Sequence, residues 1–284
     1  MTTKKILFLV CLGGTILFVL LFASLFVACS PEAVEEQSLP IDSKEVTLYT
    51  GEKEANAPST RTTINDAGDV FWSSSDVIFV NGAPSTRTTV TNDGLYAEFT
   101  ANASAPYSAV YPASMVVYYS PSAGGWLYKI VLPMEQSYKN DISFADGVNP
   151  SIAYSSNENL IFQNLCGILR MQIKADCMGV RKVRFTSMDT LVSGLANVYV
   201  NSSSNMQSLE IVDGKNIVDV TFDFGRTFSE YVPIDVFWVL PVGNYGSGWT
   251  VSLLDSDDNV LAVGTSESFL ISRSKITDLG ELAF

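Results

Sequence analysis

The stretch TTVTNDGLYAEFT, residues 88–100, decides the fold class of this 284-residue chain. Its two flanks are rich in β-branched and aromatic residues, which favour strands. Between them lie Asn92, Asp93 and Gly94, residue types that accept the positive φ angles of a tight turn. The stretch therefore predicts an antiparallel β-hairpin.

The same pattern continues along the chain, with short apolar strands separated by turn residues and no long segment of helical period. Hairpin turns are expected at residues 81–82, 124–125, 213–214 and 255–259, and residues 160–173 are expected to form one long strand. Many short strands without crossover helices imply antiparallel sheets packed as β-sandwiches. Loop residues at 150–159 suggest two tandem domains, an N-terminal one at residues 45–155 and a C-terminal one at residues 156–284.

The N-terminus predicts export. Two lysines precede residues 6–28, which carry no charge, as in a signal peptide spanning residues 1–28. Residues 25–29, Leu-Phe-Val-Ala-Cys, resemble the bacterial lipobox, so Cys29 is the expected lipidation site and residues 29–44 the tether behind it. A retained membrane-spanning helix is the alternative, because roughly 20 apolar residues suffice to cross a bilayer.

The net charge limits the partners that the chain could bind, and the cysteine content limits the disulfides that it could form. The formal net charge is -13, and so acidic a chain without a basic stripe is not expected to bind nucleic acid. Two further cysteines, Cys166 and Cys177, would remain as thiols in the exported protein. A disulfide between them and a buried free thiol at Cys166 are both compatible with the sequence.

The chain contains no histidine, which excludes Ser-His-Asp and Cys-His hydrolysis and histidine-ligated zinc. No catalytic residue, metal site or cofactor is predicted, and the chain is not expected to be an enzyme. Residues 255–259, Asp-Ser-Asp-Asp-Asn, have the oxygen ligands of a calcium loop but lack the glycine and distal glutamate of an EF-hand, so a hairpin turn is expected there.

Aromatic residues gather in one region of the sequence. They could form a sugar-stacking platform or fill a sandwich core. The residues are Tyr111, Tyr118, Tyr119, Trp126, Tyr128 and Tyr138.

Several motifs, in this order along residues 29–284, resemble the fimbrillin family of Bacteroidota, which comprises pilus subunits and related surface lipoproteins. After the lipobox and tether come Thr60-Arg61-Thr62, then Trp72 followed by an Asp-led apolar strand at residues 76–80, and then Leu-Pro-x-x-Gln-x-Tyr at residues 132–138. A Phe-x-Asn-leading strand at residues 160–169, Leu191-Val192-Ser193-Gly194 and the terminal residues 276–280 complete the pattern.

The resemblance implies two transthyretin-like sandwiches that assemble by strand addition. In such pili a protease cuts after an arginine and removes an N-terminal strand, and a neighbouring subunit fills the groove. Here residues 46–50 would be the removed strand and Arg61 the cleavage site, with Arg87 as a second candidate and residues 267–284 as a candidate donor segment.

The resemblance also implies other fimbrial subunits as partners, anchoring to the outer membrane through the lipid, a location at the cell surface in a fimbrium, and a host or microbial surface ligand. Asp189-Thr190-Leu191 resembles the O-glycosylation site of exported Bacteroidota proteins, which makes Thr190 a candidate for modification, although a simple strand entry has the same pattern. A surface glycan-binding lipoprotein is the alternative function.

Overall fold

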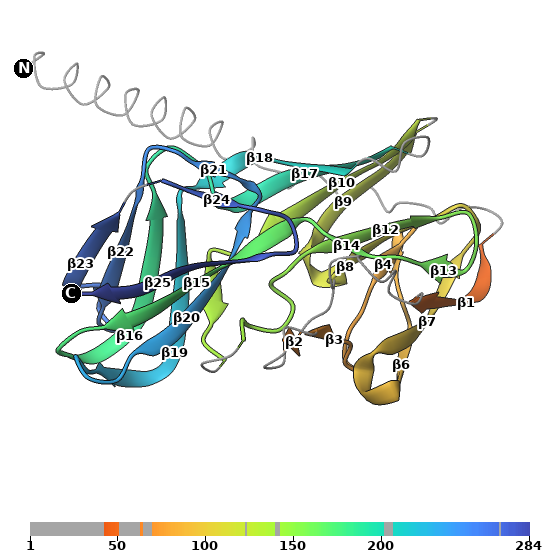
Figure 1. The fold of residues 1–284 in the computed structure, drawn as a ribbon. Coiled ribbons are helices and arrows are strands. Elements are labelled where there is room, and N and C mark those ends of the chain that lie inside the picture. The colour runs from red at the N-terminus through yellow and green to blue at the C-terminus, as the bar shows by residue number, and fades with distance from the viewer. Residues whose placement is uncertain are drawn as a thin grey trace, which may run out of the picture. The chain divides into compact units, whose positions relative to one another are not determined.

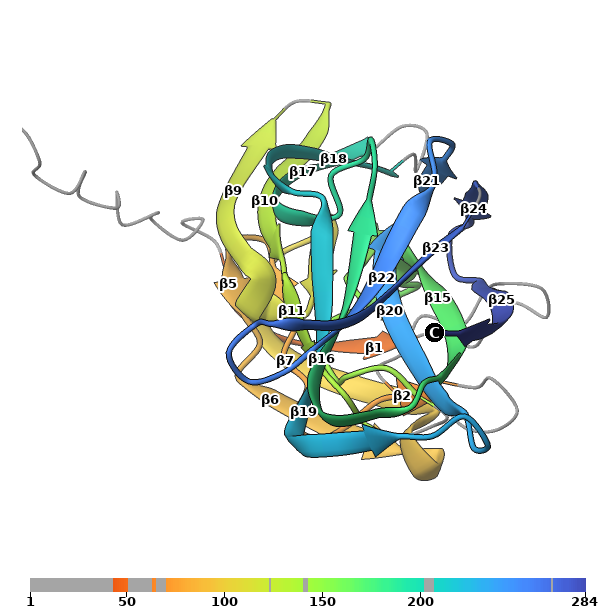
Figure 2. The same cartoon turned by 90° about the vertical axis from the view of Figure 1, so that its left-hand side faces the viewer.

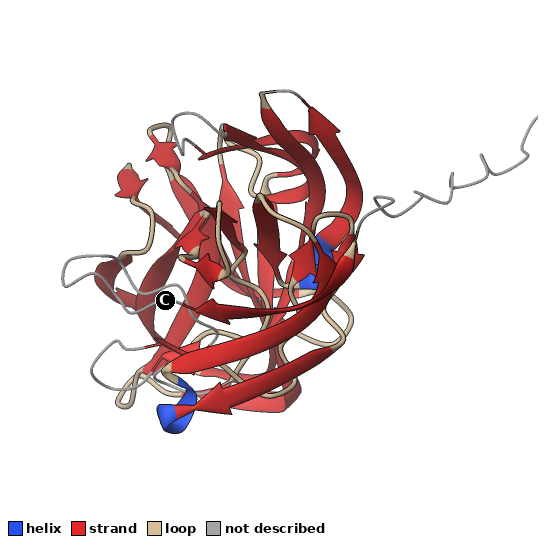
Figure 3. Ribbon diagram, turned by 90° about the vertical axis from the view of Figure 1, so that its right-hand side faces the viewer, coloured by secondary structure: helices blue, strands red, loops and turns tan. Residues whose placement is uncertain are grey.

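Strands make up about two thirds of the described residues in this computed structural model (Figure 3). The structure describes residues 43–50, 63–64, 70–122, 124–139, 143–201, 207–266 and 268–284. The all-β prediction is confirmed. Within these residues, no helix has the length and apolar character needed to cross a membrane.

The strands, labelled in Figure 1, are β1 (Lys44–Thr50), β2 (Thr63–Ile64), β3 (Val70–Phe71), β4 (Phe79–Val80), β5 (Ala83–Pro84), β6 (Arg87–Thr91), β7 (Tyr96–Ala103), β8 (Tyr107–Tyr111), β9 (Val116–Ser122), β10 (Gly125–Leu132), β11 (Glu135–Ser137), β12 (Ser151–Ser155), β13 (Asn159–Leu160), β14 (Gln163–Asn164), β15 (Cys166–Lys174), β16 (Cys177–Ser187), β17 (Ser193–Asn201), β18 (Gln207–Lys215), β19 (Ile217–Phe228), β20 (Ile234–Pro241), β21 (Gly243–Tyr245), β22 (Trp249–Leu254), β23 (Val260–Ser266), β24 (Phe269–Ile271) and β25 (Ile276–Ala283). Two short 3-10 helices, η1 (Asn92–Gly94) and η2 (Ala113–Met115), lie in connections.

The first sandwich packs a four-stranded sheet, in the order β13-β1-β7-β6, against a five-stranded sheet, β14-β12-β8-β4-β5. Trp72 lies at the centre of the core between them. Its ring meets those of Phe99 on β7, Tyr111 on β8 and Phe162 edge-on, with centroids 5.2, 5.3 and 5.4 Å away. Edge-to-face contacts of this kind add to the stability that burial supplies, so Trp72 joins the two sheets.

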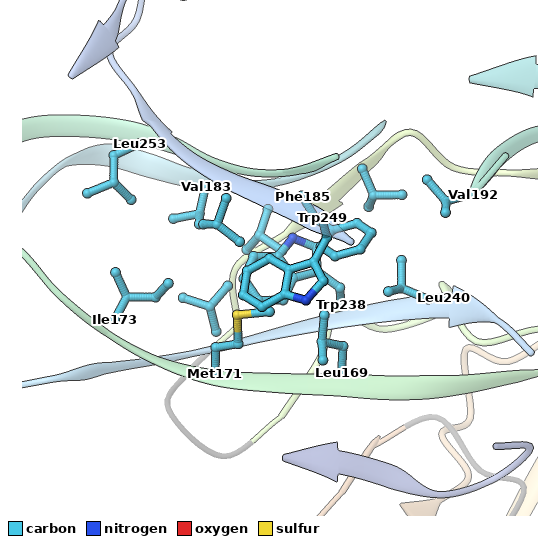
Figure 4. Close-up of a cluster of buried hydrophobic side chains, with 14 of the residues drawn as sticks. Leu169, Met171, Ile173, Val183, Phe185, Val192, Trp238, Leu240, Trp249 and Leu253 are labelled. Atoms are coloured by element: carbon cyan, nitrogen blue, oxygen red, sulfur yellow. The ribbon is translucent and has the colours of Figure 1, made fainter. Parts of the chain in front are cut away.

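The second sandwich packs the sheet β11-β19-β16-β22-β23 against β20-β15-β25. Figure 2 shows β15 and β20 of the smaller sheet and β16, β19 and β22 of the larger one. Their facing side chains form the cluster in Figure 4, in which Trp238 is fully buried and lies 6.3 Å from the ring of Phe185.

A further sheet, β18-β17-β10-β9, is called here the bridging sheet because its inner face packs on both sandwiches. Its residues Tyr128, Ile130 and Val198 share a buried cluster with Ile152 of β12 and Val239 of β20. Strands β12 and β20 are thus covered on both faces, which accounts for the uninterrupted apolar run in β20, typical of strands buried on both sides.

Strand pairing crosses the expected boundary at residues 155/156 in several places. β1 pairs with β13, β12 with β14, β10 with β17 and β11 with β19. The described residues from Ser43 onward belong to one compact unit. The division into domains at 45–155 and 156–284 stays a prediction, and the two sandwiches exchange strands across it.

The hairpin at residues 88–100 is confirmed. Thr91 of β6 pairs with Tyr96 of β7 around η1, where Asn92 and Asp93 take φ angles of 51° and 53°. The hairpins at residues 81–82, 124–125 and 255–259 are also confirmed by the pairing of β4 with β5, β9 with β10, and β22 with β23.

The turn at Asp255 is held by its own carboxylate. Asp255 Oδ1 accepts hydrogen bonds from the backbone N–H groups of Asp257 and Asn259, at 2.8 and 2.9 Å. Among the described residues no group of three His, Cys, Asp or Glu side chains could hold a metal ion. The expected hairpin turn is what these residues form.

The predicted hairpin turn at residues 213–214 is wrong. Strand β18 continues through both residues, which pair with β17 beside a register shift, whereas β19 lies in another sheet. Gly214 is required for a different reason: a Cβ there would lie 2.0 Å from the backbone oxygen of Ser193. The glycine lets the backbones of β17 and β18 approach closely, which is one reason for a glycine inside a strand.

The single strand expected at residues 160–173 is also wrong. The segment divides into β13, β14 and β15, which belong to three sheets. Leu160 and Phe162 join the first core, and Leu165 joins the cluster under the bridging sheet. One continuous apolar run therefore supplies residues to more than one core. Periodicity alone does not distinguish such a run from one long strand.

Gln136 connects β11 to the open edge of β20. Its side-chain Nε2 donates to the backbone oxygen of Val239, and its Oε1 accepts from the Val239 N–H, both at 3.0 Å. Gln136 is 2% exposed, so these two bonds replace the water that the backbone groups would otherwise need.

We expect Gln136→Ala to lower the free energy of unfolding by about 1–3 kcal/mol, because it leaves a buried N–H and C=O of Val239 without partners. Urea titration followed by circular dichroism measures the change. The neighbouring exposed residue offers the control, since Ser137→Ala should leave the midpoint nearly unchanged. Equal midpoints for both variants would contradict this role for Gln136.

Candidate functional site

The first strand, β1, is the candidate assembly site. It pairs antiparallel with β7 over residues 44–49, from Lys44 opposite Ala103 to Tyr49 opposite Glu98. On its other side only Tyr49 and Thr50 pair, in parallel, with the two residues of β13. Among the described strands, most of β1 is therefore paired on one side alone (Figure 1).

The side chains of β1 alternate between core and surface. Leu48 is fully buried in the first core, Val46 packs against the same cluster, and Tyr49 points outward with 43% of its side chain exposed. This period of two is what a strand with one buried face requires. The sequence prediction that residues 46–50 form a strand is confirmed.

The C-terminal end of β1 is held more tightly. Thr50 Oγ1 donates to the Ala97 oxygen at 3.2 Å and accepts from the Ala97 N–H at 2.7 Å. The Tyr49 N–H donates to the Glu158 oxygen at 2.8 Å. Near this junction, burial and then the Glu158 carboxylate raise the pKa of Tyr107. Strand β1 is therefore held on both sides at its C-terminal end, whereas the rest of it pairs with β7 alone among the described strands.

This arrangement has a defined chemical consequence. Removing β1 would leave the backbone N–H and C=O groups of β7 without partners and open the slot that Leu48 fills. Both are the features that an added strand recognises, since backbone bonds supply affinity and alternate side chains supply register.

The two residues that the sequence predicts to be processed, Cys29 and Arg61, lie outside the described residues. The second cleavage candidate, Arg87, is exposed but begins β6, where it pairs with Thr100 of β7. A peptide bond held in a sheet is a poor protease substrate, because its segment must leave the neighbouring strand before it can enter a protease active site.

Most of the candidate donor segment is occupied in this structure. β24 pairs with β21, and β25 pairs in parallel with β15 at an edge of the second sandwich. Ion pairs of Arg170 with Asp278 at 2.8 Å and of Lys174 with Glu281 at 2.7 Å fasten β25. Residue 267 lies outside the described part.

Cys166 and Cys177 are free thiols. Cys166 begins β15 and Cys177 begins β16, and the length of β15 separates them by roughly 27 Å. A disulfide requires Cα atoms within about 7 Å, so the disulfide alternative is wrong and the free, buried thiol is correct for Cys166.

Thr190 lies in the connection between β16 and β17. Its hydroxyl donates to Asp189 Oδ1 at 3.0 Å, and Asp189 Oδ2 accepts from the Ser247 N–H at 3.2 Å. Hydrogen bonding by the side chain of Ser247, and then by the hydroxyl of Thr190, lowers the pKa of Asp189. The connection is thus locally ordered, and modification of Thr190 stays a prediction.

The aromatic residues that could form a platform mostly fill cores. Tyr111, Tyr119 and Tyr128 are buried. Trp126 is half-buried against Tyr154, and the half-buried Tyr138 packs at a tilt against Phe222. Tyr118 alone of the six is exposed.

Sequence reasoning missed two residues that shape this region. Leu160 of β13 closes the end of β1, and Gln136 reaches β20 from β11. The only signal for either was membership in a motif of the resembled family, because contacts between distant segments leave no local period in a sequence.

No family model matches the chain, and no curated protein matches it. Two solved structures align with it, each described as a "putative cell adhesion protein". The one from Bacteroides ovatus has 11% identity and a TM-score of 0.45 and covers 84% of this chain and 92% of its own. The one from Bacteroides uniformis has 12% identity and a TM-score of 0.40 and covers 83% and 93%. The match to the fimbrillin family therefore stays a resemblance.

We expect the two thiols to differ in reactivity. Burial raises the pKa of Cys166 to about 12, so that thiol stays protonated at pH 8, and the thiolate is the species that alkylates. Iodoacetamide at pH 8 followed by peptide mapping should modify Cys177 and spare Cys166 until urea unfolds the chain. Equal labelling of both in the native protein would contradict the burial of Cys166.

Proposed function

We propose that this protein is a structural or adhesive subunit of cell-surface fimbriae, exported as a lipoprotein on Cys29 and assembled by β-strand addition. The observation that supports the proposal is the pairing of β1, which borders β7 along its length but meets β13 only at Tyr49 and Thr50. A strand paired mainly on one side can leave the sheet without disrupting the strands beyond it.

Cleavage after Arg61 would make departure of β1 irreversible. The cut separates β1 from β2 and the rest of the first sandwich, so only noncovalent contacts retain the strand. An incoming strand from a neighbouring subunit would then supply the backbone bonds to β7 and a side chain for the slot of Leu48. In this proposal the uncut precursor keeps its lipid anchor and the cut subunit joins a fibre.

We expect an Arg-specific protease to cut the purified protein after Arg61 and to produce a ladder of oligomers. Denaturing electrophoresis and mass spectrometry identify the cut, and native electrophoresis shows the ladder. Arg61→Gln should abolish both, while Arg87→Gln, the matched control, should change neither. A chain that is cut after Arg61 yet stays monomeric would rule out the polymerising role.

We also expect Leu48→Ala to weaken the hold of the cut strand. Loss of a fully buried leucine costs about 2–5 kcal/mol, so the fragment that contains β1 should dissociate faster after cleavage. Size-exclusion chromatography of the cleaved protein measures the retained fragment. Tyr49→Ala, an outward-facing change on the same strand, provides the comparison. If the two variants retained the fragment equally, the buried slot would not be what holds β1.

A further inference from the structure

The outer face of the bridging sheet gathers exposed side chains from all four of its strands. They are Val117 and Tyr118 on β9, Val131 on β10, Tyr199 on β17 and Val212 on β18, exposed by 59, 44, 42, 44 and 47%. The inner face of the same sheet is buried against both sandwiches. The tyrosines therefore stand on a rigid support.

The strand register orders this face into two rows. In the first, Tyr118 lies opposite Lys129, Lys129 opposite Asn197, and Asn197 opposite Glu210. In the adjacent row Leu127 lies between Ser120 and Tyr199, and Tyr199 lies opposite Ser208. Side chains opposite one another across strands lie within reach of each other. Each tyrosine thus has hydrogen-bonding neighbours on the same face.

Two contacts confirm that rings and polar groups are interleaved. Lys129 Nζ lies 5.4 Å from the centroid of the Tyr118 ring. Asn197 Nδ2 donates to Tyr199 Oη at 3.4 Å. Because the two tyrosines lie two strands apart and in adjacent rows, strand geometry places their Cα atoms roughly 12 Å from each other.

This combination favours a sugar over a protein partner. A pyranose has an apolar C–H face that stacks on an aromatic ring and a rim of hydroxyl groups that both donate and accept hydrogen bonds. Lys129 and Asn197 are donors near the two rings, and Glu210, opposite Asn197 on the edge strand β18, is an acceptor beside them. A protein interface would instead have few charges at its core.

We propose that the outer face of the bridging sheet binds an oligosaccharide, with Tyr118 and Tyr199 as stacking rings and Lys129, Asn197 and Glu210 as hydrogen-bonding groups. The ligand spans both rings and lies flat on the sheet. The site is on a different sheet from β1, so it stands or falls independently of strand addition.

The full chain, purified in detergent, is applied to an array of neutral and acidic oligosaccharides, and the strongest binder is titrated by calorimetry. Tyr118→Ala and Tyr199→Ala should each weaken binding about tenfold or more, the order of effect that loss of one stacking ring has in other aromatic platforms. Tyr118→Phe keeps the ring and should bind nearly as the unmodified protein does.

Tyr231→Ala is the matched control, because Tyr231 is 86% exposed in the loop between β19 and β20. It should leave the affinity unchanged, and thermal unfolding should show all variants folded, since the changed side chains face outward. The proposal is overturned if no array sugar binds, or if binding survives both alanine changes. It is equally overturned if the protein proves to be a dimer that Tyr199→Ala dissociates, because a second copy would then occupy this face.

Discussion

The fold depends on burial of both faces of β15 and β20. Val236, Trp238 and Leu240 of β20 enter the second sandwich core, whereas Phe237 and Val239 enter the cluster beneath the bridging sheet. Neither cluster would be closed without the other, because the same strands form a wall of each. The core of the second sandwich and the contact with the bridging sheet therefore depend on the same strands. A substitution in β20 affects the packing of both.

How much the sequence reveals depends on whether a signal is local. The turn at Asn92, Asp93 and Gly94 was predictable because those residues take positive φ angles that other residues disfavour. Gly214 led to the wrong prediction of a turn, because a sequence does not show why a glycine is needed. A glycine required by the close backbone of Ser193 looks identical in a sequence to a glycine that permits a turn. Likewise, the apolar run at residues 160–173 gave no sign that three sheets would share it.

The candidate assembly site was predictable in part. The family resemblance implied a removable strand at residues 46–50, and the structure forms β1 there with Leu48 buried. The parallel pairing with β13 could not be foreseen, since it joins residues more than a hundred positions apart and depends on where the chain leaves β12. The outward-facing row of Tyr118, Lys129 and Asn197 depends on the register of three strands, and sequence alone does not fix that register.

Gln136 has a consequence for solubility. Strand β20 is an edge of its sheet, and open edges invite pairing with other chains. The side-chain amide of Gln136 already occupies the outward N–H and C=O of Val239, near the C-terminal end of that edge. An intruding strand would have to displace a buried group to pair in register. One glutamine thus disfavours the pairing of another chain with this edge, which ends at Pro241, while β23, the edge strand of the opposite sheet, has no such side-chain cap among the described contacts.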